Sequence, residues 1–353
     1  MKKTNWKKLL SGSFTTYAMV IIAYVVVEGL ITTGNISSLL EGLMVPLCTY
    51  VILAISLNLI VGILGELSLG HAGFMCIGAF SSAFFSKSTQ DVITNSGLRF
   101  LIAILIGAVC AAIFGILIGI PVLRLKGDYL AIVTLAFGEI IKNVINVLSI
   151  GRDSKGFHFA INKTIGVVDS DGEMIIKGAQ GITGTPNDST FTIGVILVLV
   201  SIFIVTNLIK SRTGRAIMAI RDNRIAAESV GINITQYKLL SFTISAALAG
   251  VAGVLYAHNL SSLIASPKNF GYNMSIMILV FVVLGGIGNI RGSIISAVLL
   301  TLLPEVLRFM SDYRMLIYAI VLIIMMLFNW SPKCIELRER YSLKRLLTKK
   351  KEA

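Results

Sequence analysis

The feature that most constrains this chain is a succession of apolar runs, each about as long as a bilayer is thick. Hydrophobic residues make up 55% of the 353 positions and charged residues only 14%, against ~25% charged residues in soluble domains. A soluble core cannot bury so many long apolar runs, whereas a bilayer can. We therefore predict an all-α polytopic membrane protein, with residues 1–353 forming a single transmembrane domain.

A transmembrane helix needs ~20 mostly apolar residues. About ten runs have this character, and we expect spans at 14–34, 42–63, 68–86, 98–121, 128–149, 190–209, 239–258, 272–289, 293–310 and 314–330. Eight spans are an alternative, in which the short segments 68–86 and 293–310 are re-entrant.

The charge distribution predicts how the spans are oriented. The net charge is +13, and the basic residues cluster at the two ends and in segments between apolar runs, which argues against a nucleic-acid-binding face. With ten spans, the N-terminus, the segment 210–238 and the basic tail 331–353 fall on one side, which the positive-inside rule makes cytoplasmic. The loop 150–189 is then extracytoplasmic. We expect a multi-pass protein of the cell (plasma or inner) membrane with both termini in the cytoplasm.

The sequence contains no motif for a metal site, a disulfide framework or nucleotide hydrolysis. Cys48, Cys76, Cys110 and Cys334 form no CxxC pair, and the first three lie within apolar runs. No GxxxxGK[ST] loop is present, so we expect no catalytic residue, cofactor or ATPase activity in this chain. An active transporter of this kind would take its energy from an ion gradient or from a separate subunit.

Glycines gather in two short stretches, "GILGELSLGHAGFMCIGAF" (62–80) and "GGIGNIRGS" (285–293). One interpretation is close helix packing through small residues, as expected for Gly115 and Gly119. The other is a pair of broken helices at matching places in two halves, which is typical of transport sites.

Ionisable residues within apolar runs are further candidates, because each costs at least ~2.5–3.5 kcal/mol at the centre of a membrane helix. Glu28 and Glu305 fit interfacial positions. We predict a translocation path or gate from the remaining ionisable residues and the polar part of the first glycine stretch: Gly65, Glu66, Ser68, Gly70, His71, Gly73 and Glu139. The alternative is that these residues shape a gate and bind nothing.

A charged segment, 210–238, interrupts the apolar pattern. Within it, "SRTGRAIMAIRD" (211–222) predicts an amphipathic helix with Ile217 and Ile220 on one side, and "RIAAESV" (224–230) predicts about two further helical turns. Asn223 is a suitable N-cap and Gly231 a suitable terminating glycine. So short a helix needs packing, on its own bundle or on a partner. It is either a plain connector or a coupling helix that seats in a groove of an ATPase.

Four motifs carry a resemblance to a known family. They are "LNLIVGILGELSLGHAGF" (57–74), "GDYLAIVTLAFGEIIK" (127–142), the segment 211–257 that begins "SRTGRAIMAIRDNRIAAESVG", and "VVLGGIGNIRGSIISAVLLTLLPEVLR" (282–308). In these, the chain resembles the permease subunits of branched-chain amino acid ABC importers, and among them the longer of the two permeases. The likeness extends over roughly residues 45–310.

The resemblance implies a function and partners. It implies a translocation path for leucine, isoleucine and valine, a second permease in a heterodimer, two ATPase subunits that hydrolyse ATP, and an extracytoplasmic substrate-binding protein. It also implies ATPase-coupling roles for Arg215, Arg221, Asp222, Asn223, Ala226, Ala227, Glu228 and Gly231. Two alternatives stay open: a secondary transporter with Glu66, His71 and Glu139 as an ion relay, or a related permease for nucleosides, sugars or urea.

Overall fold

The computed structural model describes residues 6–34, 37–90, 92–125, 127–153, 156–161, 172–310 and 313–330. The predicted basic tail 331–353, with Cys334, lies outside these residues.

Helices account for most of the described chain. In order they are α1 (Trp6–Thr32), α2 (Ser38–Asn58) with its π-helical continuation η1 (Leu59–Leu64), α3 (His71–Ser88), α4 (Ser96–Val122), α5 (Asp128–Val147), α6 (Phe191–Lys210), α7 (Arg212–Asp222), α8 (Arg224–Ser229), α9 (Ile234–Ala257), α10 (Pro267–Phe270), α11 (Tyr272–Gly285), α12 (Ile290–Val306) and α13 (Arg314–Trp330). Two 3₁₀ turns, η2 (Gly178–Gln180) and η3 (Leu307–Met310), complete the helical elements.

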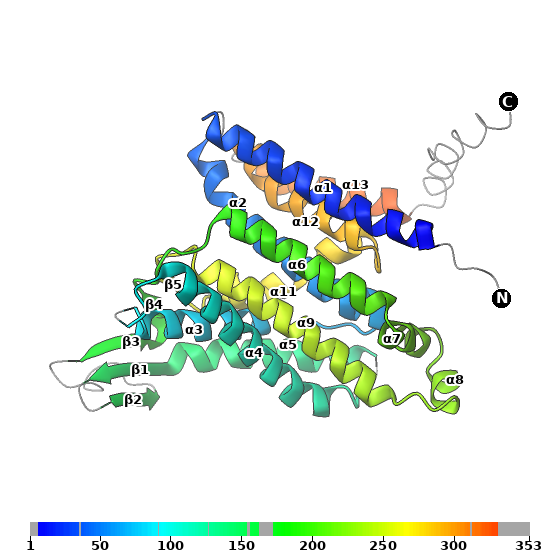
Figure 1. The fold of residues 1–353 in the computed structure, drawn as a ribbon, viewed down its shortest axis with the longest axis horizontal. Helices are drawn as coiled ribbons and strands as arrows, with labels where there is room; N and C mark the ends of the chain where they lie inside the picture. Colours follow the sequence, from blue (N-terminus) through cyan, green and yellow to red (C-terminus); the bar gives the residue numbers. More distant parts are fainter. Residues whose placement is uncertain are drawn as a thin grey trace.

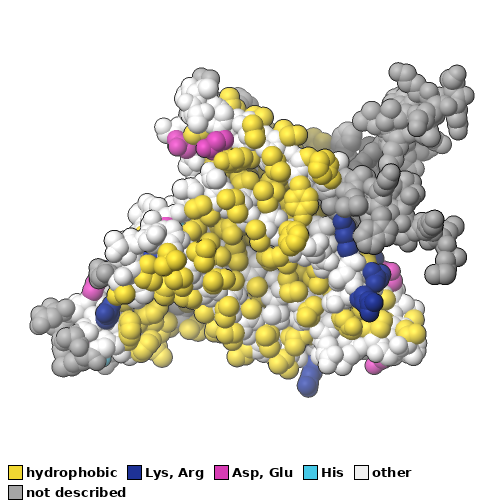
Figure 2. All heavy atoms as spheres, viewed as in Figure 1, with side chains coloured by type: hydrophobic (Ala, Val, Ile, Leu, Met, Phe, Trp, Pro, Cys, Tyr) yellow, Lys and Arg dark blue, Asp and Glu magenta, His cyan; other side chains and the backbone are white. Residues whose placement is uncertain are grey.

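The long helices lie side by side, and the connecting elements gather at two opposite ends (Figure 1). The strands lie at one end, whereas α7 and α8 lie at the other, where α1 begins. Figure 2 shows apolar side chains covering the middle of the visible face, with most of its Lys and Arg side chains toward the α7–α8 end. This arrangement is that of a helical bundle crossing a membrane, with its basic end at α7 and α8.

Helices occupy all ten places expected from the apolar runs. Seven helical segments are long and apolar enough to cross a membrane, by length and composition. The other three, α3, α12 and α13, have 18, 17 and 17 residues. The polytopic helical fold is confirmed, and the number of ten spans stays a prediction.

The predicted loop 150–189 contains strands that the sequence analysis did not anticipate. Strands β1 (Leu148–Asp153), β2 (Gly156–Ile161) and β3 (Glu173–Lys177) form an antiparallel sheet in the order β2-β1-β3. Further on, β4 (Ile182–Thr183) pairs with β5 (Ser262–Leu263) from the segment after α9. This pairing fixes the loop to the end of the bundle.

Glycines bring three helices of the bundle close together. A Cβ on Gly78 of α3 would lie 2.3 Å from the carbonyl oxygen of Gly250 in α9, and one on Gly253 would lie 2.0 Å from that of Met75. A Cβ on Gly115 of α4 would lie 2.8 Å from the Cβ of Ala246. The close-packing interpretation is therefore correct for these glycines, since a side chain would force the helices apart.

The orientation can be tested with single cysteines in a background that lacks the four native ones. Glu173 has a side chain that is 72% exposed in β3, and Ser229 is exposed at the end of α8. We expect Glu173→Cys to react with an impermeant maleimide added outside intact cells. Ser229→Cys should react only after the membrane is opened.

A cysteine at position 345, in the tail, should behave like the one at 229. Labelling of positions 173 and 229 from the same side would contradict the predicted orientation.

Candidate functional site

The first glycine stretch forms a helix break next to the α7–α8 end of the bundle. Helix α2 continues as the π-helix η1 and ends at Gly65, whose φ of 80° is the left-handed conformation that favours glycine. Residues 65–70 contain no helix, and α3 begins at His71. We call residues 65–70 the glycine break. A π-helical segment followed by an interruption is frequent at functional sites.

The second glycine stretch lies directly against the first. Gly288, with φ 80°, donates its N–H to Oδ1 of Asn58 at 2.9 Å, and Asn58 Nδ2 donates to Ser293 Oγ at 3.0 Å. A Cβ on Gly62 would lie only 2.4 Å from the Gly288 nitrogen. The two stretches thus form one contact, centred on the Asn58 amide. The sequence analysis did not single out Asn58, although a polar residue inside an apolar helix was a usable signal.

Side chains from other helices supply hydrogen bonds to the glycine break and to the start of α3. Leu69 N–H donates to Thr134 Oγ1 at 3.0 Å, and Ala72 N–H donates to Ser275 Oγ at 3.2 Å. His71 Nε2 lies 3.0 Å from Ser245 Oγ. Within the part of the chain that the structure describes, His71 Nδ1 has no hydrogen-bond partner, although it is buried. The same holds for the buried Ser68 Oγ.

Two of the predicted path glycines serve close packing. A Cβ on Gly70 would lie 2.6 Å from the carbonyl oxygen of Thr134, and a Cβ on Gly73 would lie 2.7 Å from the Cα of Gly138. Both contacts are with α5. Gly70 and Gly73 therefore allow α3 to approach α5 closely, whereas Gly65 is exposed at the break.

The charged segment 210–238 forms the expected short helices, and their ends are capped as predicted. Asn223 Oδ1 accepts the N–H of Ala226 at 3.1 Å at the start of α8. Gly231, with φ 83°, follows the end of α8. Helix α7 does not extend α6, because Ser211 is extended and caps α7 by accepting the N–H of Gly214. Arg215 donates to the carbonyl of Lys210 at 3.2 Å, at this same junction.

Two basic residues of this segment contact the glycine break. Arg221 Nη1 donates to the carbonyl oxygen of Gly62 at 3.0 Å, and its guanidinium also pairs with Asp222 at 2.9 Å. Lys238 forms an ion pair with Glu66, and both side chains are largely buried, at 5% and 14% exposed. Both residues thus join the charged segment to the first glycine stretch, and their expected roles toward an ATPase and in the path stay predictions.

The two alanines of α8 have different surroundings. Ala227 is 3% exposed and packs against Ile220 and Ile234, whereas Ala226 is exposed. Ala227 therefore faces its own bundle, and its implied role toward an ATPase stays a prediction. Ile225 and Val230 are 81% and 77% exposed. The remaining exposed residues of α8 and its caps are Asn223, Arg224, Ala226, Glu228, Ser229 and Gly231.

Glu139 lies near the middle of α5 and joins two helices. Its Oε1 accepts the N–H of Tyr272, the first residue of α11, at 2.7 Å, and it forms an ion pair with Lys142. Lys142 is 7% exposed at its side chain, whereas Glu139 is 25% exposed. Glu139 thus places a partly exposed carboxylate near the middle of α5. Among the described residues, no group of three or more His, Cys, Asp or Glu residues is placed to hold a metal ion.

Comparisons with known proteins support one family for this chain. Residues 39–328 match the family described as "Branched-chain amino acid transport system / permease component". The permease protein LivM of a high-affinity branched-chain amino acid transport system, from Salmonella typhimurium, is 35% identical over 294 residues, which cover 80% of this chain and 67% of LivM. LivM of Escherichia coli gives the same identity and coverage.

More distant relatives are also permeases, and they are named for branched-chain amino acids or for other solutes. LivH of Escherichia coli, another branched-chain amino acid permease, is 24% identical over 71% of this chain and 79% of LivH. The nucleoside ABC transporter permease NupC of Lactococcus lactis is 26% identical over 56% of this chain and 60% of NupC. No solved structure matches the chain. The match over residues 39–328 and the similarity to LivM show that this chain belongs to the family of permease components of branched-chain amino acid transport systems.

Proposed function

We propose that this chain forms the translocation path for leucine, isoleucine and valine in an ATP-driven importer. Its family and its 35% identity to LivM support this substrate class. The proposed assembly contains a second permease as heterodimer partner, two ATPase subunits on the cytoplasmic side and an extracytoplasmic binding protein. Both termini of this chain are cytoplasmic in the proposal. The observation that carries the mechanism is the double connection between the charged segment 210–238 and the glycine break.

The proposed coupling starts at the exposed surface of α8. Ile225 and Val230 project into solvent from a segment that also carries Arg224 and Glu228. An apolar side chain that is exposed on the separate protein gains free energy when a groove on a partner removes it from water, and two such side chains project from this one short helix and its cap. We assign the role of ATPase contact to these two side chains, with Arg224, Ala226 and Glu228 around them.

Movement of α7 and α8 would be transmitted to the membrane-spanning helices through the contacts of two charged side chains. Arg221 donates a hydrogen bond to the carbonyl oxygen of Gly62 in η1, and Lys238 forms an ion pair with Glu66 in the glycine break. Because Gly65 permits a backbone conformation that other residues rarely adopt, the break can change direction without unfolding α2 or α3. The proposed result is that docking and closure of the ATPases reorient the start of α3.

The partly exposed Glu139 indicates which face lines the path. An ionisable group at the centre of a membrane helix is costly against lipid, so it faces protein or water. Tyr272, next to it, is 49% exposed. The α5–α11 face that carries these residues is therefore assigned to the path or to the second permease. This arrangement does not favour an ion relay through Glu66, since Lys238 engages that carboxylate.

The energy source and substrate can be measured together in right-side-out vesicles that contain the full transport system. We expect leucine uptake to require ATP inside the vesicles and to continue when an uncoupler collapses the proton gradient. Unlabelled isoleucine and valine should compete with leucine, whereas adenosine, ribose and urea should not. Uptake that follows the proton or sodium gradient, without dependence on ATP, would show a secondary transporter instead.

Loss of the ion pair between Lys238 and Glu66 is expected to uncouple ATP hydrolysis from transport. In Lys238→Met the carboxylate of Glu66 loses its partner, and a hydrogen bond to a charged group contributes about 1.5–3 kcal/mol. We expect uptake to fall about tenfold or more, while membrane insertion, ATPase co-purification and ATP hydrolysis persist. The exchanged pair Glu66→Lys with Lys238→Glu should recover part of the uptake.

Arg212→Met is the matched control, because Arg212 is exposed at the start of α7 and has a basic side chain on the same segment. It should transport nearly as well as the unchanged protein, since an exposed charge contributes ~0–1 kcal/mol. Normal uptake by Lys238→Met would refute the proposed transmission through Glu66.

Docking at α8 gives a separate test. We expect Ile225→Asp combined with Val230→Asp to abolish ATPase co-purification and uptake, because both changes place charges where an apolar contact is required. Val92→Asp is the control, since Val92 is also exposed, at 74%, but lies in the segment between α3 and α4.

Ala227→Arg has a different expected effect. It should disturb the packing of Ala227 on Ile220 and Ile234, and so lower the stability of the segment itself. Undiminished ATPase binding by the double Asp variant would exclude α8 as the docking surface.

A further inference from the structure

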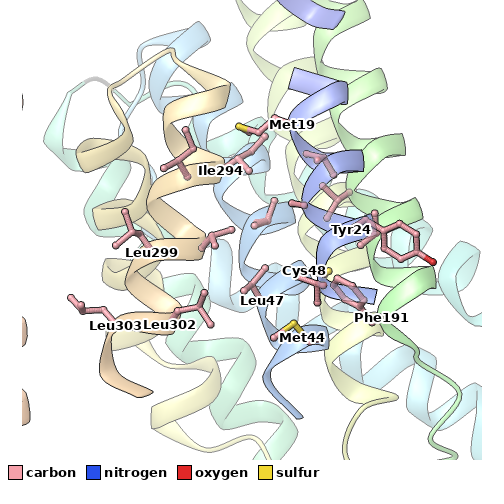
Figure 3. Close-up of a pocket in the computed structure, with 18 of the residues that line it drawn as sticks. Met19, Tyr24, Met44, Leu47, Cys48, Phe191, Ile294, Leu299, Leu302 and Leu303 are labelled. Atoms are coloured by element: carbon pink, nitrogen blue, oxygen red, sulfur yellow. The ribbon is translucent and has the colours of Figure 1, made fainter. Parts of the chain in front are cut away.

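A large apolar cavity lies between helices α1, α2, α6 and α12. Its volume is ≈ 560 Å³, and its wall includes Met19 of α1, Leu47 of α2, Val195 of α6 and Leu299 of α12. Figure 3 shows side chains of α12 and α2 lining the space beside α1. Apolar side chains form nearly all of the wall, and the volume lies within the ~300–1,000 Å³ typical of ligand pockets.

The cavity exists because α1 touches the rest of the bundle at few points. Tyr24 packs against Phe191 with ring centroids 5.6 Å apart, and Thr16 Oγ1 accepts a hydrogen bond from Arg291 at 2.8 Å. On its other side α1 exposes large apolar residues, including Ile22 at 63%. Helix α1 also precedes residue 39, where the family match begins. The cavity is therefore the seam between α1 and the helices that the family match covers.

The chemistry of the wall excludes several occupants. Water needs two to four polar partners, and apolar cavities stay dry. A transported amino acid would leave its ammonium and carboxylate groups unpaired in an apolar space, at a cost of many kcal/mol. The chain ends outside the described residues are also unsuitable, because 1–5 contains two lysines and 331–353 is rich in charge.

The size of the cavity favours a narrow occupant over a helix from a partner subunit. A helix with side chains is ~10–12 Å wide, whereas the volume of ≈ 560 Å³ is that of a pocket for a small ligand. An unbranched aliphatic chain is narrow enough to enter and flexible enough to follow the gap between α1 and α12.

We propose that this cavity binds one acyl chain of a membrane phospholipid, which fills the seam under α1. The acyl chain would supply van der Waals contacts that side chains do not make between α1 and the bundle, because atoms that line an empty space have no partner atoms there. The headgroup would stay at the membrane surface, because the wall offers it almost no polar partner. The lipid is thus a structural component that attaches α1, and the proposal does not depend on which solute the protein transports.

The test uses adjacent valines that point in different directions from α1. Val27 lines the cavity, whereas Val26 is 55% exposed on the outer side. The full-length chain, with any subunits that accompany it, is purified in a mild detergent with added dipalmitoyl phosphatidylethanolamine. It is then washed with lipid-free detergent and examined by native mass spectrometry. We expect one phospholipid per chain to be retained by the unchanged protein and by Val26→Trp. Val27→Trp should lose it, because the indole occupies the space of the acyl chain.

Val298→Trp fills the cavity from α12 and should lose the lipid as well, which provides an independent variant. Circular dichroism and size-exclusion behaviour identify a variant that fails to fold, and the other filling variant then decides the result. The proposal is overturned if the unchanged protein retains no phospholipid after washing. It is also overturned if a correctly folded filling variant retains as much as Val26→Trp.

Discussion

Every backbone polar group that a helix break exposes inside a membrane must find a partner within the protein, and this requirement organises the region around the glycine break. The glycine break between α2 and α3 interrupts the backbone ladder. Thr134 of α5 and Ser275 of α11 accept the N–H groups on either side of His71, and Asn58 accepts the N–H of Gly288. Helices far apart in the sequence are thereby held together by the break itself. A change in the break must consequently rearrange contacts with α5, α11 and α12 at once.

The charged segment 210–238 lies next to this arrangement and is joined to it. It carries two kinds of residue: exposed apolar side chains on α8, and basic side chains that turn back to the bundle. Ile225 and Val230 are exposed to water, whereas Arg221 donates a hydrogen bond to Gly62 and Lys238 forms an ion pair with Glu66. One side of the segment therefore suits a partner and the other is attached to the break. A plain connector would not need both.

The sequence predicted the helical membrane fold, the places of the ten helices and the caps of α8, because each depends on local pattern: apolar run length, Asn223 and Gly231. It did not predict which side of a short helix turns inward. Two neighbouring alanines, Ala226 and Ala227, look alike in sequence, and only packing on Ile220 and Ile234 distinguishes them. The Glu66–Lys238 pair joins residues 172 positions apart, so no local signal could reveal it. The sheet β1–β3 was equally hidden, since its short strands form in a loop whose composition is mixed.

The glycines separate the bundle into a rigid part and a part that can move. Where α3, α4 and α9 meet, Gly78, Gly250 and Gly253 bring backbones into direct contact, and such packing tolerates little displacement. In the glycine break and in the turn before α12, Gly65, Gly286 and Gly288 have positive φ values, and the missing Cβ of Gly65 and of Gly286 would meet side chains rather than backbone. The same residue type thus serves close backbone packing in one region and left-handed turns in the other. In the proposed coupling, a displacement of Arg221 and Lys238 would act on the glycine break, while the closely packed helices behind it would keep their positions.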